Sequence, residues 1–67
     1  MTRRLQIISV EFDYINHEIT IKYNNLKVVR IVRQFYTTEL VGGTDEMREL
    51  ARPIARDYND FIQGGNL

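Results

Sequence analysis

The chain has no cysteine, no tryptophan, one histidine and one proline in 67 residues. Without cysteine it forms neither a disulfide nor a thiolate metal site. The single histidine, His17, excludes a zinc site made of histidines from one chain. A chain of this length buries only about 60% of the surface that its unfolded form exposes, so it needs an efficient core or a partner subunit. We therefore expect a homodimer, with no metal and no cofactor.

Net charge is also absent, because nine basic residues balance nine acidic ones. A neutral chain has no general attraction to nucleic acid or to an anionic membrane. The apolar runs are only a few residues long, too short to span a membrane. No apolar segment follows Arg3 and Arg4, as a signal peptide would require. Together with the lack of cysteine, these features predict a cytoplasmic protein.

The hydrophobic period changes at Gly42 and Gly43, where strand-like alternation gives way to a helical pattern. The sequence therefore predicts a single α+β domain over residues 1–67, with a β-sheet in 1–41 and a helix over 44–63. The sheet is expected to be a three-stranded antiparallel meander with the helix on one face. The expected strands cover residues 5–12, 15–23 and 26–36. Residues 37–41 either continue as a short fourth strand after a bend or form the edge of the sheet.

The expected second strand alternates most regularly. Its apolar face is Ile15, His17, Ile19, Ile21 and Tyr23. Asn24 and Asn25 follow, and we expect a two-residue type I′ hairpin there, since asparagine tolerates positive φ. In the first strand, alternation places Ile8, Val10, Phe12 and Tyr14 on one face and Leu5 and Ile7 on the other. The alternation slips between Val28 and Val29 and again near Phe35, which indicates a bulge or a strong twist.

The helix has a recognisable start and stop. Thr44 is the expected N-cap, with Asp45 and Glu46 in the first turn, and Gly64 follows the last apolar residue. Pro53 removes one helical hydrogen bond, so we expect a kink there. One apolar stripe is expected to pack on the sheet: Met47, Leu50, Ala51, Ile54, Tyr58, Phe61 and Ile62.

The residues that catalysis would need are few. Ser9 and His17 would face each other across the first hairpin only if the register allowed it. Glu11 and Asp13 share one side of the first strand, but a carboxylate pair needs a cleft to separate its pKa values. The turn before the helix resembles a phosphate cradle only faintly, because no lysine follows it. We therefore expect no enzyme.

Charges on the helix divide by flank. Arg48, Arg52 and Arg56 climb one flank, whereas Glu46, Glu49, Asp57 and Asp60 lie on the other. The simplest interpretation is a solvated face with local ion pairs, Glu49–Arg52 and Arg56–Asp60. The functional interpretation is a protein-binding surface of Arg48, Arg52, Arg56, Glu49 and Asp60, or an antiparallel helix pair that joins opposite flanks of two copies.

The sequence thus predicts a small non-enzymatic protein-binding module, an inhibitor or adaptor of the phage type, acting as a homodimer. The alternative is a nucleic-acid-binding protein that uses the arginine flank. Aromatic residues beside arginines favour the alternative, since bases stack on aromatic rings. The residues concerned are Tyr14, Tyr23, Phe35, Tyr36, Arg30 and Arg33. We expect no membrane partner.

Overall fold

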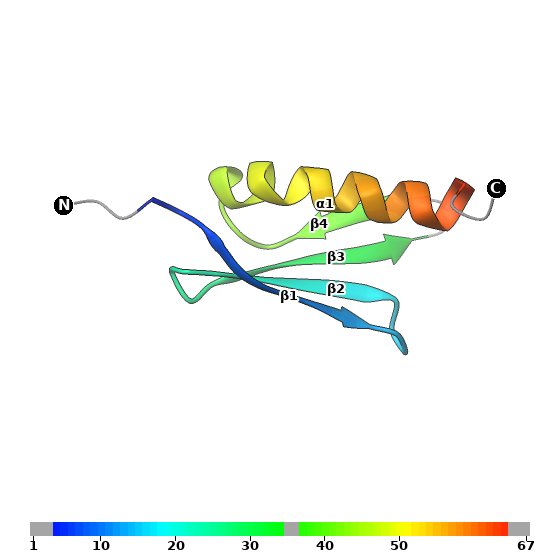
Figure 1. Cartoon of the computed structure of the whole chain (residues 1–67), viewed down its shortest axis with the longest axis horizontal. Coiled ribbons are helices and arrows are strands. Elements are labelled where there is room, and N and C mark those ends of the chain that lie inside the picture. The colour runs from blue at the N-terminus through cyan, green and yellow to red at the C-terminus, as the bar shows by residue number, and fades with distance from the viewer. Residues whose placement is uncertain (1–3, 35–36, 65–67) are drawn as a thin grey trace.

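The computed structural model describes residues 4–34 and 37–64, and side chains other than those of residues 34 and 62–64. Its elements are β1 (Ile7–Asp13), β2 (Glu18–Tyr23), β3 (Val28–Gln34), β4 (Thr37–Val41) and α1 (Asp45–Gly64). The strands form one antiparallel sheet in the order β1-β2-β3-β4, and α1 packs across one face (Figure 1). The predicted α+β fold is confirmed, and the short fourth strand is present.

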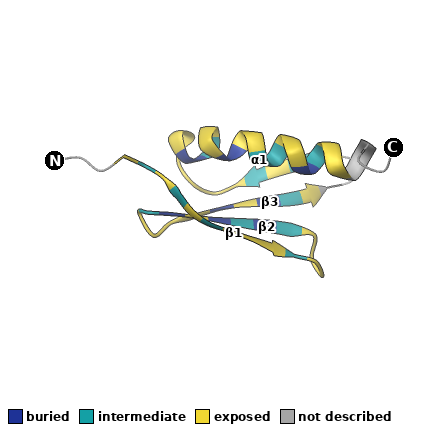
Figure 2. Ribbon diagram, viewed as in Figure 1, coloured by how far each residue is buried: buried dark blue, intermediate teal, exposed yellow. Residues whose placement is uncertain are grey.

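The core lies between α1 and the middle of the sheet. Eight apolar residues are buried there: Ile19, Ile21, Tyr23, Val29, Ile31, Met47, Ala51 and Tyr58. The hydroxyl of Tyr23 donates a hydrogen bond of 2.6 Å to the carbonyl oxygen of Met47, which ties β2 to the first turn of the helix. Because α1 contacts β4 and β3, the outer strand β1 is left largely exposed (Figure 2).

A β-bulge at Ile8 changes the facing of β1. Ile7 lies opposite Tyr23, but Ser9 lies opposite Lys22, so two steps along β1 match one step along β2. Ile7 and Val10 therefore share the helix-side face of the sheet. The sequence pattern placed Leu5 and Ile7 on the sheet face opposite to that of Val10. That prediction was wrong, because Leu5 and Ile7 also pack against the core.

The predicted bulge between Val28 and Val29 is absent from the described residues. Lys22 lies opposite Val28 and Ile21 opposite Val29, so this part of the register is regular. Val28 faces away from the helix, whereas Val29 is buried beneath it. The second predicted irregularity, at Phe35, lies outside the described residues.

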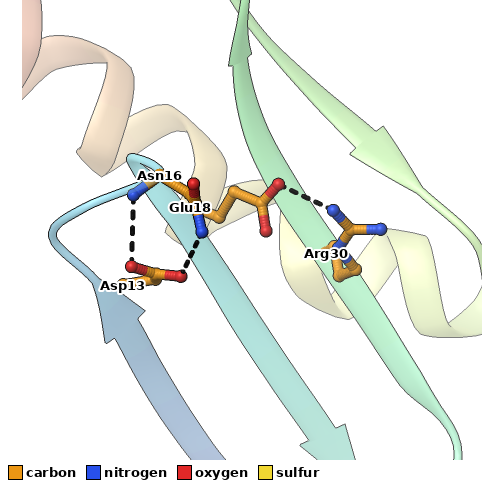
Figure 3. A network of polar contacts seen from close by, with 4 residues as sticks. All are labelled: Asp13, Asn16, Glu18 and Arg30. Atoms are coloured by element: carbon orange, nitrogen blue, oxygen red, sulfur yellow. Dashed lines mark hydrogen bonds and ion pairs between the residues drawn. The ribbon is translucent and has the colours of Figure 1, made fainter.

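The turn of the first hairpin is longer than the alternation indicates, because β2 begins at Glu18 and not at residue 15. Asp13 Oδ1 accepts hydrogen bonds from the backbone N–H groups of Ile15 (3.0 Å) and Asn16 (3.2 Å), and its Oδ2 accepts one from Asn16 Nδ2 (2.9 Å; Figure 3). This capture of backbone donors by an aspartate side chain forms a turn. Ile15 and His17 therefore lie in the turn, and Ile15 is 88% exposed. The prediction that both belong to the second strand was wrong.

The second hairpin also differs from the prediction. The residue with positive φ is Leu26 (φ 70°), not Asn24 or Asn25. The N–H of Leu26 donates to Tyr23 O, and the N–H of Tyr23 donates to Lys27 O, each at 3.0 Å. This is a three-residue loop, a turn followed by a residue in the left-handed region. The predicted two-residue type I′ turn was wrong.

The start of α1 agrees with the sequence. Thr44 Oγ1 accepts the N–H of Met47 at 3.3 Å, as an N-cap does. Gly42 and Gly43 before it have φ of 85° and 79°, a region that glycine enters without strain. The helix is continuous through Pro53 (Figure 1), and the kink at that residue stays a prediction.

Candidate protein-binding surfaces

The arginine flank is partly engaged within the molecule. Arg48 is half-buried, and its Nε donates to the carbonyl oxygen of Gly42 at 3.0 Å, which ties the helix to the loop before it. Arg52 Nε lies 2.9 Å from Glu49 Oε2, and both side chains are exposed. The predicted Glu49–Arg52 ion pair is therefore confirmed, and it links the acidic flank of the helix to the arginine flank.

Arg56 and Asp60 are exposed, and no side-chain hydrogen bond or ion pair joins either of them to another described residue. An Arg56–Asp60 pair is accordingly not formed among those residues. The five residues predicted to bind a partner thus lie on one outer helix face, but they do not form a continuous free ridge. Arg56 is the one arginine of the three that stays available.

The candidate catalytic residues are not brought together. Ser9 lies opposite Lys22, five positions from His17, a separation of roughly 16 Å at the rise of a β-strand. Hydrogen bonds from the Asn16 side chain and backbone lower the pKa of Asp13 below 3.8, so this carboxyl does not act as an acid near neutral pH. Neither arrangement supports catalysis.

The part of the chain that the structure describes contains neither a cluster of metal ligands nor a membrane-spanning helix. No group of three His, Cys, Asp or Glu side chains in residues 4–34 and 37–64 lies close enough to hold a metal ion. Among the same residues, no helix has the length and apolar character needed to cross a membrane.

The sheet face opposite α1 is mostly polar, although Val28 and Val41 also lie on it. Glu18 and Arg30 form an ion pair of 2.6 Å between β2 and β3, and Figure 3 shows it beside the Asp13 turn. Thr20 lies directly opposite Arg30 on the same face. Because Arg30 is already paired, it offers little to a phosphate. This face therefore behaves as a solvated surface.

A different surface lies where the end of α1 meets the outer strand. Four rings gather there, from Phe12, Tyr14, Tyr58 and Phe61, and we call them the aromatic surface. The Phe12 and Tyr14 ring centroids are 4.6 Å apart, and Phe12 meets Tyr58 edge to face at 5.3 Å. Tyr58 is buried, whereas Phe61 is 71% and Tyr14 79% exposed.

These rings border a partly open hollow of about 340 Å³ that His17 and Arg33 also line. The register explains why Arg33 is there. Ile31 faces the helix, and Arg33, two residues further along β3, faces the same side. His17 reaches the hollow from the first turn, where its φ is 56°.

The aromatic surface is exposed because one helix is too narrow for this sheet. Four strands span about 14 Å between the outermost strand axes, and a helix with its side chains is about 10 Å wide. Since α1 lies over β4 and β3, the helix-side face of β1 is only partly covered. Val10 is 50% exposed and Phe12 38%, although both point to the same side as the core.

The sequence patterns do not predict that these aromatic side chains are exposed. Phe12 belongs to an alternating strand and Phe61 to the apolar helical stripe, and each pattern predicts a buried residue. Of the stripe, Met47, Ala51 and Tyr58 are buried, but Leu50 is 40% exposed. Neither pattern reports the distance of β1 from the helix, which depends on the order of strands.

Comparisons with protein-family models, with curated proteins and with solved structures found no match to this chain.

Proposed function

We propose that the protein is a small non-enzymatic protein-binding module, an inhibitor or adaptor, whose partner docks on the aromatic surface. The observation that carries this proposal is the exposure of Phe12, Tyr14 and Phe61 beside the outer edge of β1, which has no strand partner among the described residues. Aromatic residues are enriched at the centres of protein interfaces, where they bury much area for little side-chain entropy. The lack of cysteine fits a reducing compartment, and we propose the cytoplasm.

The exposed area supports an interface of modest size. The exposed fractions of Phe12, Tyr14 and Phe61 are 38%, 79% and 71%, which together equal 1.88 fully exposed aromatic side chains. At 150–250 Å² a ring, they present about 280–470 Å². A standard interface buries about 800 Å² on each partner, so these rings supply roughly half of one side. Val10, on the same face of β1 as Phe12, extends the surface.

The expected homodimer is a separate proposal, because a dimer through the aromatic surface would cover the site of the partner. A two-fold axis brings the same region of both copies together. The helix pair that joins opposite flanks would then be excluded, because a two-fold axis sets acidic flank against acidic flank. Light scattering at micromolar concentration is expected to give twice the 7.9 kDa mass of one chain, and a monomer mass would sink the dimer.

Partner capture tests the main proposal with a matched control. The Phe61→Ser variant removes one exposed ring, and Leu26→Ser removes an equally exposed apolar side chain (84%) from the turn between β2 and β3. We expect wild-type protein and Leu26→Ser to retain the same protein from an extract of the source cell, and Phe61→Ser to lose it. Equal retention by all three would contradict docking on the aromatic surface.

Nucleic-acid binding is the second candidate, because the same rings lie beside Arg33. Its cation supply is limited, since Arg30, Arg48 and Arg52 have partners within the chain. Phosphate contacts would make affinity fall steeply with salt. If generic DNA and RNA do not bind at low salt, this candidate is excluded.

A further inference from the structure

We propose that the hollow of the aromatic surface receives an acidic peptide segment, with an apolar side chain between the rings and an adjacent aspartate or glutamate on Arg33. This inference rests on the protein-binding function proposed above and names the chemistry of the partner. The segment is extended and continues along the outer edge of β1.

The size and lining of the hollow fit one side chain. Its volume of about 340 Å³ is at the lower end of the range for ligand sites. The rings of Phe12, Tyr14 and Tyr58 are in mutual contact through Phe12, so the floor is held in place, and Phe61 forms an exposed wall. Stacking and edge-to-face contacts of this kind favour an aromatic or large aliphatic guest.

The charge in the hollow selects an anion. Arg33 is exposed, and no ion pair joins it to another described residue. A guanidinium binds a carboxylate through two parallel hydrogen bonds, and desolvation by neighbouring rings strengthens such a pair. His17 adds a second polar group on the same wall. The nearby carboxylate of Asp13 is occupied by its own turn.

The edge of β1 gives the segment its path. β1 is the first strand of the sheet, so its outer backbone groups have no strand partner among the described residues. An extended peptide can add there as a fifth strand, with main-chain hydrogen bonds for affinity and a side-chain pocket for specificity. The bulge at Ile8 limits this pairing to the part of β1 nearest the hollow.

The charge around the hollow favours a peptide over nucleic acid. A nucleic acid strand carries one phosphate per nucleotide and needs several cations along its path. Arg33 is a single arginine, and the adjoining flank of α1 carries Asp57 and Asp60. One carboxylate beside one apolar anchor matches that distribution better.

Two short probes test the inference because they differ by one group. N-acetyl-phenylalanyl-glutamate amide carries the carboxylate, and N-acetyl-phenylalanyl-glutamine amide is its neutral isostere. We expect the first to bind with a dissociation constant of about a millimolar, as its size allows, and to shift the amide resonances of the hollow in NMR spectra. The second should bind about tenfold more weakly.

Variants assign the difference to one side chain. Arg33→Gln should lower the affinity for the glutamate probe to that for the glutamine probe. Lys27→Gln, which removes an exposed cation from the turn between β2 and β3, should leave both affinities unaltered. Equal binding of the two probes, or shifts outside the hollow, would overturn the acidic-segment proposal. Tighter binding of an oligothymidylate or of N-acetylphenylalanine, whose carboxylate ends the chain, would overturn it in favour of nucleic acid or of a chain terminus. Loss of the partner on Phe61→Ser tests docking separately.

Discussion

The two glycines before the helix provide a matched pair for testing how tightly α1 is seated. Both have positive φ, 85° at Gly42 and 79° at Gly43, where an alanine costs about 1–2 kcal/mol. Their surroundings differ. A Cβ at Gly42 would meet Val28 O at 3.6 Å, an ordinary contact. At Gly43 it would overlap with Val29 Cγ2 and lie 3.3 Å from Met47 Cε.

The expected magnitudes follow from this difference. Val29 and Met47 are fully buried, so neither can move aside without disturbing the core, and overpacking adds about 1–3 kcal/mol. Gly42→Ala should therefore lower the free energy of unfolding by about 1–2 kcal/mol. Gly43→Ala should lower it by about 2–5 kcal/mol, a large part of the roughly 3–10 kcal/mol available to a 67-residue chain.

Urea unfolding followed by far-UV circular dichroism measures both variants. The additional cost at Gly43 should disappear in a Val29→Ala background, because the overlapping methyl group is then absent, and a double-mutant cycle isolates that term. If the two glycine variants agree within about 0.5 kcal/mol, or if the cycle shows no coupling, then the close seating of the helix start on β3 is refuted.

Three further predictions concern the turns and the core. Leu26→Asn should stabilise the protein by about 1 kcal/mol, since asparagine tolerates the φ of 70° that leucine does not; a lower melting temperature would contradict the turn. Tyr23→Phe removes the bond to Met47 O and should cost about 1 kcal/mol, a fall of about 4–8 °C in melting temperature for a domain of this size. Because hydrogen bonds from Asn16 lower the pKa of Asp13 in the folded state below 3.8, its contribution to stability is present above that pH and is lost as the pH falls through the folded-state value. Acid titrations should accordingly show the stability gap between wild type and Asp13→Asn closing below pH 3.8, and a constant gap would contradict this linkage.

The fold class was predictable because the hydrophobic period changes once, at Gly42, and because each apolar pattern is long. The capping of α1 was predictable from Thr44, since its hydroxyl acts locally on Met47. Both features depend on residues close in sequence. That is why single-sequence reasoning reaches them.

The turns were predicted less well because competing local interactions decide them. Asparagine pairs favour a type I′ turn, but here Asn25 Oδ1 accepts the N–H of Lys27 at 3.0 Å and closes a longer loop. Asp13 likewise ends β1 by binding the backbone of the following residues. Side-chain hydrogen bonds of this type compete with the strand ladder, and alternation of apolar residues does not report them.

The aromatic surface was unpredictable for a different reason. Whether Phe12 is covered depends on which strands α1 crosses, and that is a property of the whole sheet. The bulge at Ile8 adds a second non-local effect, because it reverses the facing of the residues before it. The arginine flank is a regular feature of the sequence because its arginines recur every four residues. In the structure, however, Arg48 donates a hydrogen bond to the carbonyl oxygen of Gly42 within the same chain.

The sheet depends on α1 for its stability, and the hydrogen bond from Tyr23 to Met47 is one of the contacts that form only when the helix is present. Each strand pairs with its neighbour in sequence, so the hairpins close over short loops and can form rapidly. Their apolar face, however, stays bare until α1 has been synthesised, because Met47 and Ala51 complete the core. A nascent chain that stops before α1 therefore carries a sheet with one exposed apolar side, a form prone to aggregate. Cooperative stability arrives with the last third of the chain.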